Sequence, residues 1–207
     1  MAIFITITLV FSLLCISELS WRKHKVHDEF SRKFVHITVG GFVAFWPYFL
    51  SWDEIRLLSL AFLIAVGISK QFNLFKAIHA VSRPTWGEIF FAISAGLMTF
   101  VTNNAAIYTV ALLQMGLADG LAAVIGTRYG KHNQYKIFGH AKSLVGAAAF
   151  FITSYSILLT YFIFTGHISI GWCLLVAAGA AGLENLGVQG IDNLLVPLFV
   201  ALMLIRL

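Results

Sequence analysis

The stretch that decides the fold is residues 116–146, GLADGLAAVIGTRYGKHNQYKIFGHAKSLVG. It joins two apolar runs, 105–126 and 144–164, each close to the roughly 20 residues that a helix needs to cross a bilayer. Its first half nevertheless carries a carboxylate, Asp119, among glycines and alanines, and its second half is basic. We therefore expect two membrane helices joined by a basic loop, with an acid placed where membranes rarely tolerate one.

The composition extends this interpretation to the whole chain. Of its 207 residues, 59% are hydrophobic and only 11% are charged, and the mean hydropathy is +0.88. A soluble domain carries about 25% charged residues, and membrane β-barrels show an alternation of polar and apolar residues that this sequence lacks. The sequence predicts an all-α, polytopic integral membrane protein that forms one domain over residues 1–207.

The apolar runs define eight candidate spans, with seven as the alternative count because the third and the eighth are short. The spans are 3–20, 34–50, 55–69, 86–102, 105–126, 144–164, 168–187 and 193–207. The first run is followed, not preceded, by its basic cluster, and no small-residue cleavage site follows it. We therefore expect it to be a retained span and not a secretory signal.

Lysine and arginine residues predict the orientation. Twelve of the 14 lie between spans one and two, three and four, or five and six. They are Arg22, Lys23, Lys25, Arg32, Lys33, Lys70, Lys76, Arg83, Arg128, Lys131, Lys136 and Lys142. Because basic loops stay in the cytoplasm, we expect these three loops on the cytoplasmic side, with both termini on the other side. In a prokaryote the membrane would be the plasma membrane.

Three acids approach the cytoplasmic face under this topology: Asp119, Glu184 and Asp192. Ionisable groups in membrane segments are costly, so each is a candidate for function. Carboxylates could bind Mg²⁺ there, while cations and backbone N–H groups of the same face could bind phosphates. The alternative is that each acid pairs with a basic residue and holds two helices together.

Asp119 shares a helical stripe with small residues spaced three and four apart. The stripe also contains Gly116, Ala123, Gly126 and Gly130. Small residues at this spacing are typical of close helix packing in membranes. The carboxylate in the same seam favours a ligand as the second interpretation.

Polar pairs open two of the predicted spans. Lys142 and Ser143 begin span six, where their side chains and the free N–H groups of a helix start could meet an anion. Asp192 and Asn193 begin the last span in the same way. These helix starts add to the polar groups expected at the cytoplasmic face.

The segment before span four is amphipathic. Apolar residues recur at near-helical spacing over 70–83, with lysines available to anionic headgroups, which predicts an interfacial helix. Thr85 is followed three residues later by Glu88, a pattern that predicts a capping box at the start of span four.

Four motifs, in order over almost the whole chain, resemble those of one known family. They are SRKFVH (31–36), ADGLAAVIGTRYG (118–130), KSLVG (142–146) and ENLGVQGIDNLLVPL (184–198). Together they resemble the CTP-dependent lipid kinases, which include dolichol kinase, phytol kinase and a fungal diacylglycerol kinase. The resemblance implies Mg²⁺-dependent transfer of the γ-phosphate of a cytosolic nucleotide, typically CTP, to the hydroxyl of a membrane lipid alcohol.

The resemblance also implies roles for particular residues. We expect metal ligands at Asp119, Glu184 and Asp192. We expect nucleotide contacts at Gly126, Arg128, Gly130, Lys131, Lys142, Ser143 and Asn193. Catalytic roles are expected for Asp119 or Asp192 as the base and for Lys142 in stabilising the transferred charge. Further candidates are Arg32, Lys33, His36 and Glu88. Relatives often have Glu where this chain has Val145, so Glu184 or Glu88 would take over its part.

Two other functions stay open. A CTP-dependent phosphatidate cytidylyltransferase would share the nucleotide, the metal and the membrane, but its Lys-Asp pair and later GGxxDRxD run are missing from this sequence. A small cation-coupled transporter would show duplicated halves with broken helices, and no duplication is visible. The expected partners are thus a nucleotide, the bilayer and a lipid alcohol of open identity, with no nucleic acid; the oligomeric state is open too.

Overall fold

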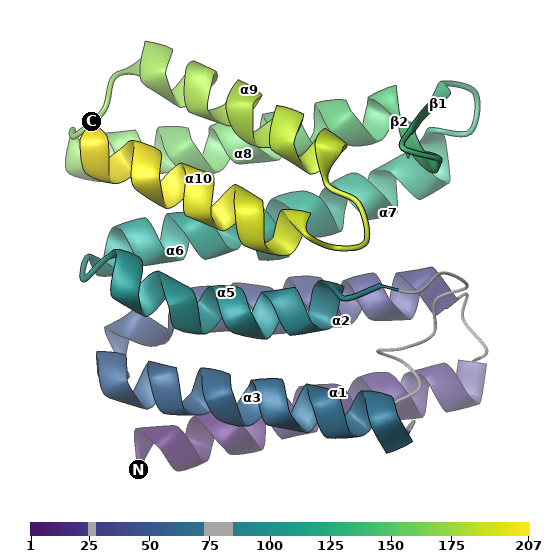
Figure 1. Ribbon diagram of the computed structural model, residues 1–207, viewed down its shortest axis with the longest axis vertical. Helices are drawn as coiled ribbons and strands as arrows, with labels where there is room; N and C mark the ends of the chain where they lie inside the picture. The colour runs from purple at the N-terminus through teal and green to yellow at the C-terminus, as the bar shows by residue number, and fades with distance from the viewer. Residues whose placement is uncertain (25–27, 73–84) are drawn as a thin grey trace.

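The computed structural model describes residues 1–24, 28–72 and 85–207, without the side chains of residues 20–32. Long helices lie side by side along one common direction (Figure 1). The helices are α1 (Ala2–His24), α2 (Asp28–Ala44), α3 (Trp52–Phe72), α5 (Gly87–Val101), α6 (Ala105–Leu113), α7 (Asp119–Tyr129), α8 (Leu144–Thr165), α9 (Ile170–Leu186) and α10 (Asp192–Arg206). Two short turns, η1 (Trp46–Tyr48) and η2 (Gln114–Ala118), and two strands, β1 (Gln134–Ile137) and β2 (His140–Ser143), complete the described elements.

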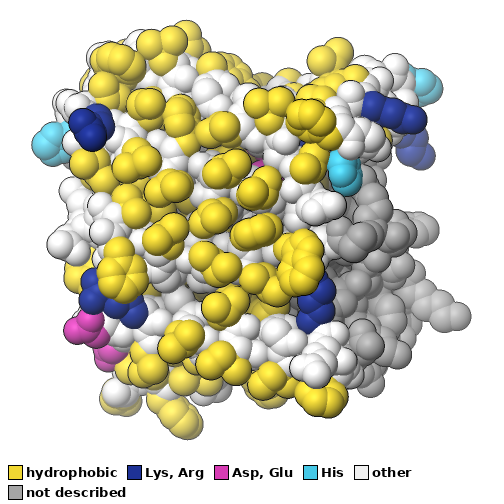
Figure 2. Space-filling view, viewed as in Figure 1, with side chains coloured by type: hydrophobic (Ala, Val, Ile, Leu, Met, Phe, Trp, Pro, Cys, Tyr) yellow, Lys and Arg dark blue, Asp and Glu magenta, His cyan; other side chains and the backbone are white. Residues whose placement is uncertain are grey.

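Within the described ranges, four helical segments are long and apolar enough to cross a membrane, and two more apolar helices are shorter. The long ones are Ala2–Leu19, Trp52–Phe72, Ala105–Tyr129 and Leu144–Thr165, and the short ones are Gly87–Val101 and Ile170–Leu186. Apolar side chains cover the face seen in Figure 2, with basic side chains toward its two ends. The prediction of a helical membrane protein is confirmed. The count of eight spans stays a prediction, and the third is not short, because α3 has 21 residues.

Packing between α2 and the α6–η2–α7 helix explains part of the small-residue stripe. A Cβ on Gly116 would lie 2.9 Å from the backbone carbon of Gly40, so only glycine permits this approach. The π-helical turn Gln114–Ala118 widens the helix just before Asp119, a feature often found at functional sites. Further on, Gly126 faces Ser143 instead of α2. The stripe is therefore a packing surface with two different partners.

The hairpin β1–β2 departs from the all-α prediction. Its strands pair antiparallel from Gln134 opposite Ser143 to Ile137 opposite His140. The two-residue loop between them, Phe138 and Gly139, has φ values of 47° and 79°, as a type I′ turn requires. Strands of four residues have no clear apolar alternation here, so the periodicity of the sequence gave no sign of them.

The chain termini lie at one end of the bundle, and the hairpin lies at the other (Figure 1). At the hairpin end α2, α5, α8 and α10 begin, and α7 and α9 end. The predicted topology requires this separation of the termini from the motif-bearing loops. The side of the membrane that each end faces stays a prediction.

The segment before α5 differs from the predicted capping box. Thr85 Oγ1 accepts a hydrogen bond from the Gly87 N–H at 3.1 Å and lies 3.3 Å from Gln189 O, to which it donates. Among the described residues, no side chain makes a capping hydrogen bond at the N-cap residue of α5, Trp86. The prediction of a capping box is therefore wrong. Thr85 instead connects this segment by a hydrogen bond to the loop before α10. The predicted interfacial helix falls largely on residues 73–84, outside the described residues.

Candidate active site

A cavity of about 490 Å³ opens at the hairpin end of the bundle. Among the described residues, the ionisable side chains that line it are Lys33, His36, Asp119, Lys131, His140, Lys142, Glu184 and Asp192. These residues come from five helices or strands and one loop that are distant in sequence. The volume lies within the range of small-molecule sites, which is about 300–1,000 Å³.

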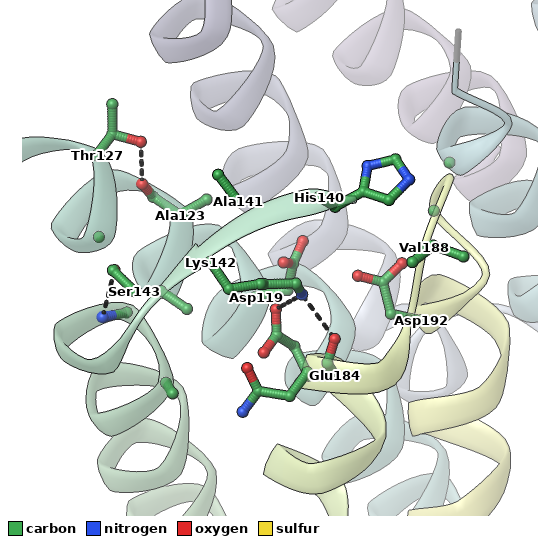
Figure 3. Close-up of a pocket in the computed structure, with 18 of the residues that line it drawn as sticks. Asp119, Ala123, Thr127, His140, Ala141, Lys142, Ser143, Glu184, Val188 and Asp192 are labelled. Atoms are coloured by element: carbon green, nitrogen blue, oxygen red, sulfur yellow. Dashed lines mark hydrogen bonds and ion pairs between the residues drawn. The ribbon is translucent and has the colours of Figure 1, made fainter. Parts of the chain in front are cut away.

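The three acids predicted as metal ligands meet in this cavity. One carboxylate oxygen each from Asp119, Glu184 and Asp192 lies within 4.8 Å of the others. Figure 3 shows their side chains converging from α7, α9 and α10. We call these three residues the acid cluster. Oxygen donors at this spacing suit a hard divalent cation such as Mg²⁺ or Ca²⁺.

Asp119 is held by two side chains of α2. Lys33 Nζ donates to Asp119 Oδ2 at 2.8 Å, and His36 Nε2 lies 3.2 Å from the same oxygen. His36 Nε2 also lies 2.8 Å from Met115 O. Because a carbonyl only accepts, Nε2 carries the proton. The SRKFVH motif therefore supports Asp119 directly.

Lys142 pairs with Glu184 at the end of α9. Its ammonium lies 2.5 Å from Glu184 Oε1 and 2.7 Å from Glu184 O, which it also reaches as a donor. Both side chains are less than one fifth exposed. A cation is favoured at a helix C-terminus, where carbonyl groups are unsatisfied. Of the two acids expected to compensate for Val145, Glu184 is the one that lies in the cavity.

Asp192 is the member of the acid cluster that has no ion pair with a lysine among the described residues. Its Oδ1 is buried and has no hydrogen-bond partner among the described residues. The preceding loop brings it into place: a Cβ on Gly190 would lie 2.4 Å from Gly87 Cα, and Gly190 has a φ of +89°. Asn193 Nδ2 donates to Gly87 O at 2.9 Å. Asp192 therefore offers a carboxylate oxygen to a ligand from a fixed backbone.

Ser143 ends β2 and directly precedes α8, across the cavity from Asp192 (Figure 3). Its Oγ accepts from the Gly146 N–H at 3.1 Å, so the residue is the N-cap of the helix. A Cβ on Gly130 would lie 2.4 Å from this oxygen. The glycine motif after Asp119 therefore shapes the space around the start of α8, where free N–H groups favour anions.

Other predicted residues fall in different places. Arg128 is exposed, does not line the cavity and lies over the ring of Tyr129 at 5.5 Å. Lys131 is exposed at the cavity lining. Glu88 does not line the cavity, although its Oε1 is buried without a hydrogen-bond partner among the described residues. The side chain of Arg32 lies outside the described part.

Sequence reasoning missed the polar side of the cavity formed by the hairpin and the end of α9. Tyr135 donates from its hydroxyl to Asn185 Oδ1 at 2.5 Å. Burial raises the pKa of Tyr135, and the nearby charge of Glu184 raises it further, so the phenol stays a donor. Asn185, Gln134 and His140 line the cavity, and Tyr135 contacts it through Asn185. Asn185 adjoins Glu184 in a quoted motif, which was the only signal for this group.

The chain is similar in sequence to several known lipid kinases. The chain is 34% identical over 187 residues to the phytol kinase of Synechocystis sp., covering 84% of this chain and 77% of that protein. It is 28% identical to a probable chloroplastic phytol kinase of Triticum aestivum, over 91% of this chain and 70% of the relative. It is 30% identical to the dolichol kinase of Saccharomyces cerevisiae, over 83% of this chain but 32% of the yeast protein. No family model and no solved structure matches.

Proposed function

Because the chain belongs to the lipid kinase family of phytol kinase and dolichol kinase, as its motifs predicted, we propose that it phosphorylates a membrane isoprenoid alcohol. The phosphate donor would be CTP and the metal Mg²⁺. The observation that carries this proposal is the meeting of the acid cluster with three lysines and the start of α8 in one cavity. Phosphoryl transfer needs this combination of metal ligands and phosphate-binding cations.

The cations and the helix start would bind the nucleotide. Lys142 directly precedes Ser143 in the sequence and lies between Ser143 and the acid cluster in the cavity (Figure 3). Its ammonium could therefore stabilise the negative charge on the transferred phosphate. The N–H groups at the start of α8 would hold the neighbouring phosphate oxygens. Lys131, exposed at the cavity lining, would meet the outer part of the nucleotide.

The acid cluster fits a bound Mg²⁺. Asp119, with Glu184 or Asp192, would hold the ion, which when bound neutralises the charge on the nucleotide phosphates. Before the ion binds, Lys33 and His36 would hold the Asp119 carboxylate in place.

Asp192 is our candidate for the base. Its buried Oδ1 has no partner among the described residues and would accept the proton of the alcohol. The alcohol oxygen then bonds to the γ-phosphorus, while the bond from that phosphorus to the β–γ bridging oxygen breaks. The products are the lipid phosphate and CDP. The alcohol would reach this end of the bundle from the surrounding bilayer, with its hydroxyl at headgroup depth.

The test is to identify the products of the purified protein in detergent with Mg²⁺. CTP labelled in the γ-phosphate or in the cytidine would be offered with phytol, a polyprenol, diacylglycerol or phosphatidate. We expect γ-label on phytol or the polyprenol. Cytidine label on phosphatidate, with pyrophosphate released, would instead establish a cytidylyltransferase and overturn the proposal.

A further inference from the structure

Two of the three carboxylates in the acid cluster are already paired with lysines. Lys33 lies 2.8 Å from Asp119, with side chains only 8% and 12% exposed. Lys142 lies 2.5 Å from Glu184, with side chains 19% and 9% exposed. Each lysine comes from a different element than its acid, α2 against α7 and β2 against α9. Both ammonium groups therefore stand beside the oxygens that a metal ion would need.

The charge balance of this group is close to neutral. Three carboxylates and two ammonium groups leave one net negative charge. A divalent cation entering alone would approach two positive charges on side chains that are less than one fifth exposed, where repulsion is screened less than in bulk water. It would also have to part each lysine from its acid and leave a buried ammonium without a partner, which is unfavourable.

A metal ion that arrives with a polyphosphate meets a different balance. Its phosphates bring negative charge for the lysines to bind as they leave the acids, and charge-assisted contacts to phosphate are strong. The carboxylates then become free for the metal. Separating the lysines from their acids is thus unfavourable when the free ion binds. When the metal–nucleotide complex binds, the new contacts between lysines and phosphates compensate for it.

We propose that Lys33 and Lys142 are internal counter-ions that exclude free divalent cation from the acid cluster, so that metal and nucleotide are bound together. The inference rests on the proposed function for the identity of the nucleotide. It makes Lys33 a positioning residue for Asp119 before binding and a phosphate ligand after it. Asp192, with its unpartnered Oδ1, would be the first carboxylate to meet the incoming complex.

The test is binding of Mn²⁺ to the full chain in detergent, measured by electron paramagnetic resonance without lipid. The wild-type protein should bind Mn²⁺ weakly alone and at least about tenfold more tightly when CTP is present. Lys33→Met should raise the affinity for Mn²⁺ alone by about tenfold or more, because one repelling charge is gone. The same variant should bind CTP more weakly.

Two controls separate this role from a general charge effect. Lys136→Met removes an exposed positive charge on β1 outside the cavity and should leave both affinities near those of the wild type. Lys33→Arg keeps the charge and should restore the weak binding of Mn²⁺ alone. Lys142→Met should act in the same direction as Lys33→Met and serves if the latter does not fold.

The proposal is overturned if the wild-type protein binds Mn²⁺ equally tightly with and without CTP. It is also overturned if neither lysine variant binds Mn²⁺ more tightly than Lys136→Met. These readouts do not use turnover. If the product assay yields no phosphorylated alcohol, the proposed function is overturned. The metal-binding measurements still test whether Lys33 and Lys142 exclude the free cation.

Discussion

The two ends of the bundle each hold an acid–base pair, and the pairs differ in their surroundings. At the end with the termini, Arg56 lies 2.7 Å from Asp53, which is 89% exposed, and also donates to Thr99. At the hairpin end, Lys33 and Asp119 form a pair that is almost fully buried. An exposed pair in water is of little consequence for stability, whereas a buried pair carries a large desolvation cost. A charge kept at that cost, in a cavity with two more acids, indicates function.

The largest difference between the two ends should come from the acids. Asp119→Asn should lower lipid kinase activity by about 10³-fold or more, because it removes a metal ligand and leaves Lys33 without its partner. Asp53→Asn changes the matching acid at the other end and should keep activity within about twofold. Initial rates at equal amounts of folded, detergent-purified protein check this. Equal losses in both variants would show that the acids act through stability.

The basic residues should show the next largest difference. Lys142→Met should lower activity by about 10²-fold, the range seen when a donor to developing negative charge is removed. Arg56→Met, at the opposite end, should leave turnover unchanged, although it loses its contacts with Thr99 and Asp53. The comparison is made on kcat with saturating CTP. Full activity in Lys142→Met would contradict the assigned role.

The two serine N-caps offer a smaller and well-matched contrast. Ser143 caps α8 in the cavity, and Ser169 caps α9 at the other end. Either Ser→Ala change should destabilise the protein by about 1 kcal/mol. Only Ser143→Ala should also weaken nucleotide use, by up to about tenfold, because one hydrogen bond at the helix start is lost. Thermal unfolding and KM for CTP separate the two effects. A raised KM in Ser169→Ala would remove the contrast.

The smallest expected effect belongs to the hairpin. Tyr135→Phe removes the hydrogen bond to Asn185 and should lower kcat/KM for CTP by about fivefold, in line with one hydrogen bond. Tyr155→Phe, on α8 away from the cavity lining, is the control. If both variants match the wild type, the hairpin contributes nothing to nucleotide use through this bond.

The helical membrane class could be predicted because it depends on long apolar runs, and the meeting of Asp119, Glu184 and Asp192 because charge placement put all three near one face. The side chain that pairs with each of these charges could not be predicted from the sequence. Lys33 reaches Asp119 across 86 positions of sequence, and close packing such as that of Gly40 on Gly116 brings the two helices together. The β-hairpin and the Tyr135–Asn185 contact were missed because four-residue strands leave no periodic signal. Arg128 was placed in the site by its motif, but the helix turns its side chain away.

The central claim is that the acid cluster and its lysines transfer a phosphoryl group to a lipid alcohol. The most direct measurement follows γ-labelled CTP with phytol or a polyprenol and the purified wild-type protein, and compares the label on the alcohol with the CDP formed. We expect one labelled alcohol phosphate for each CDP, and at least about 10³-fold less of both products with Asp119→Asn. Labelled inorganic phosphate in place of labelled alcohol, or full transfer by Asp119→Asn, would contradict it.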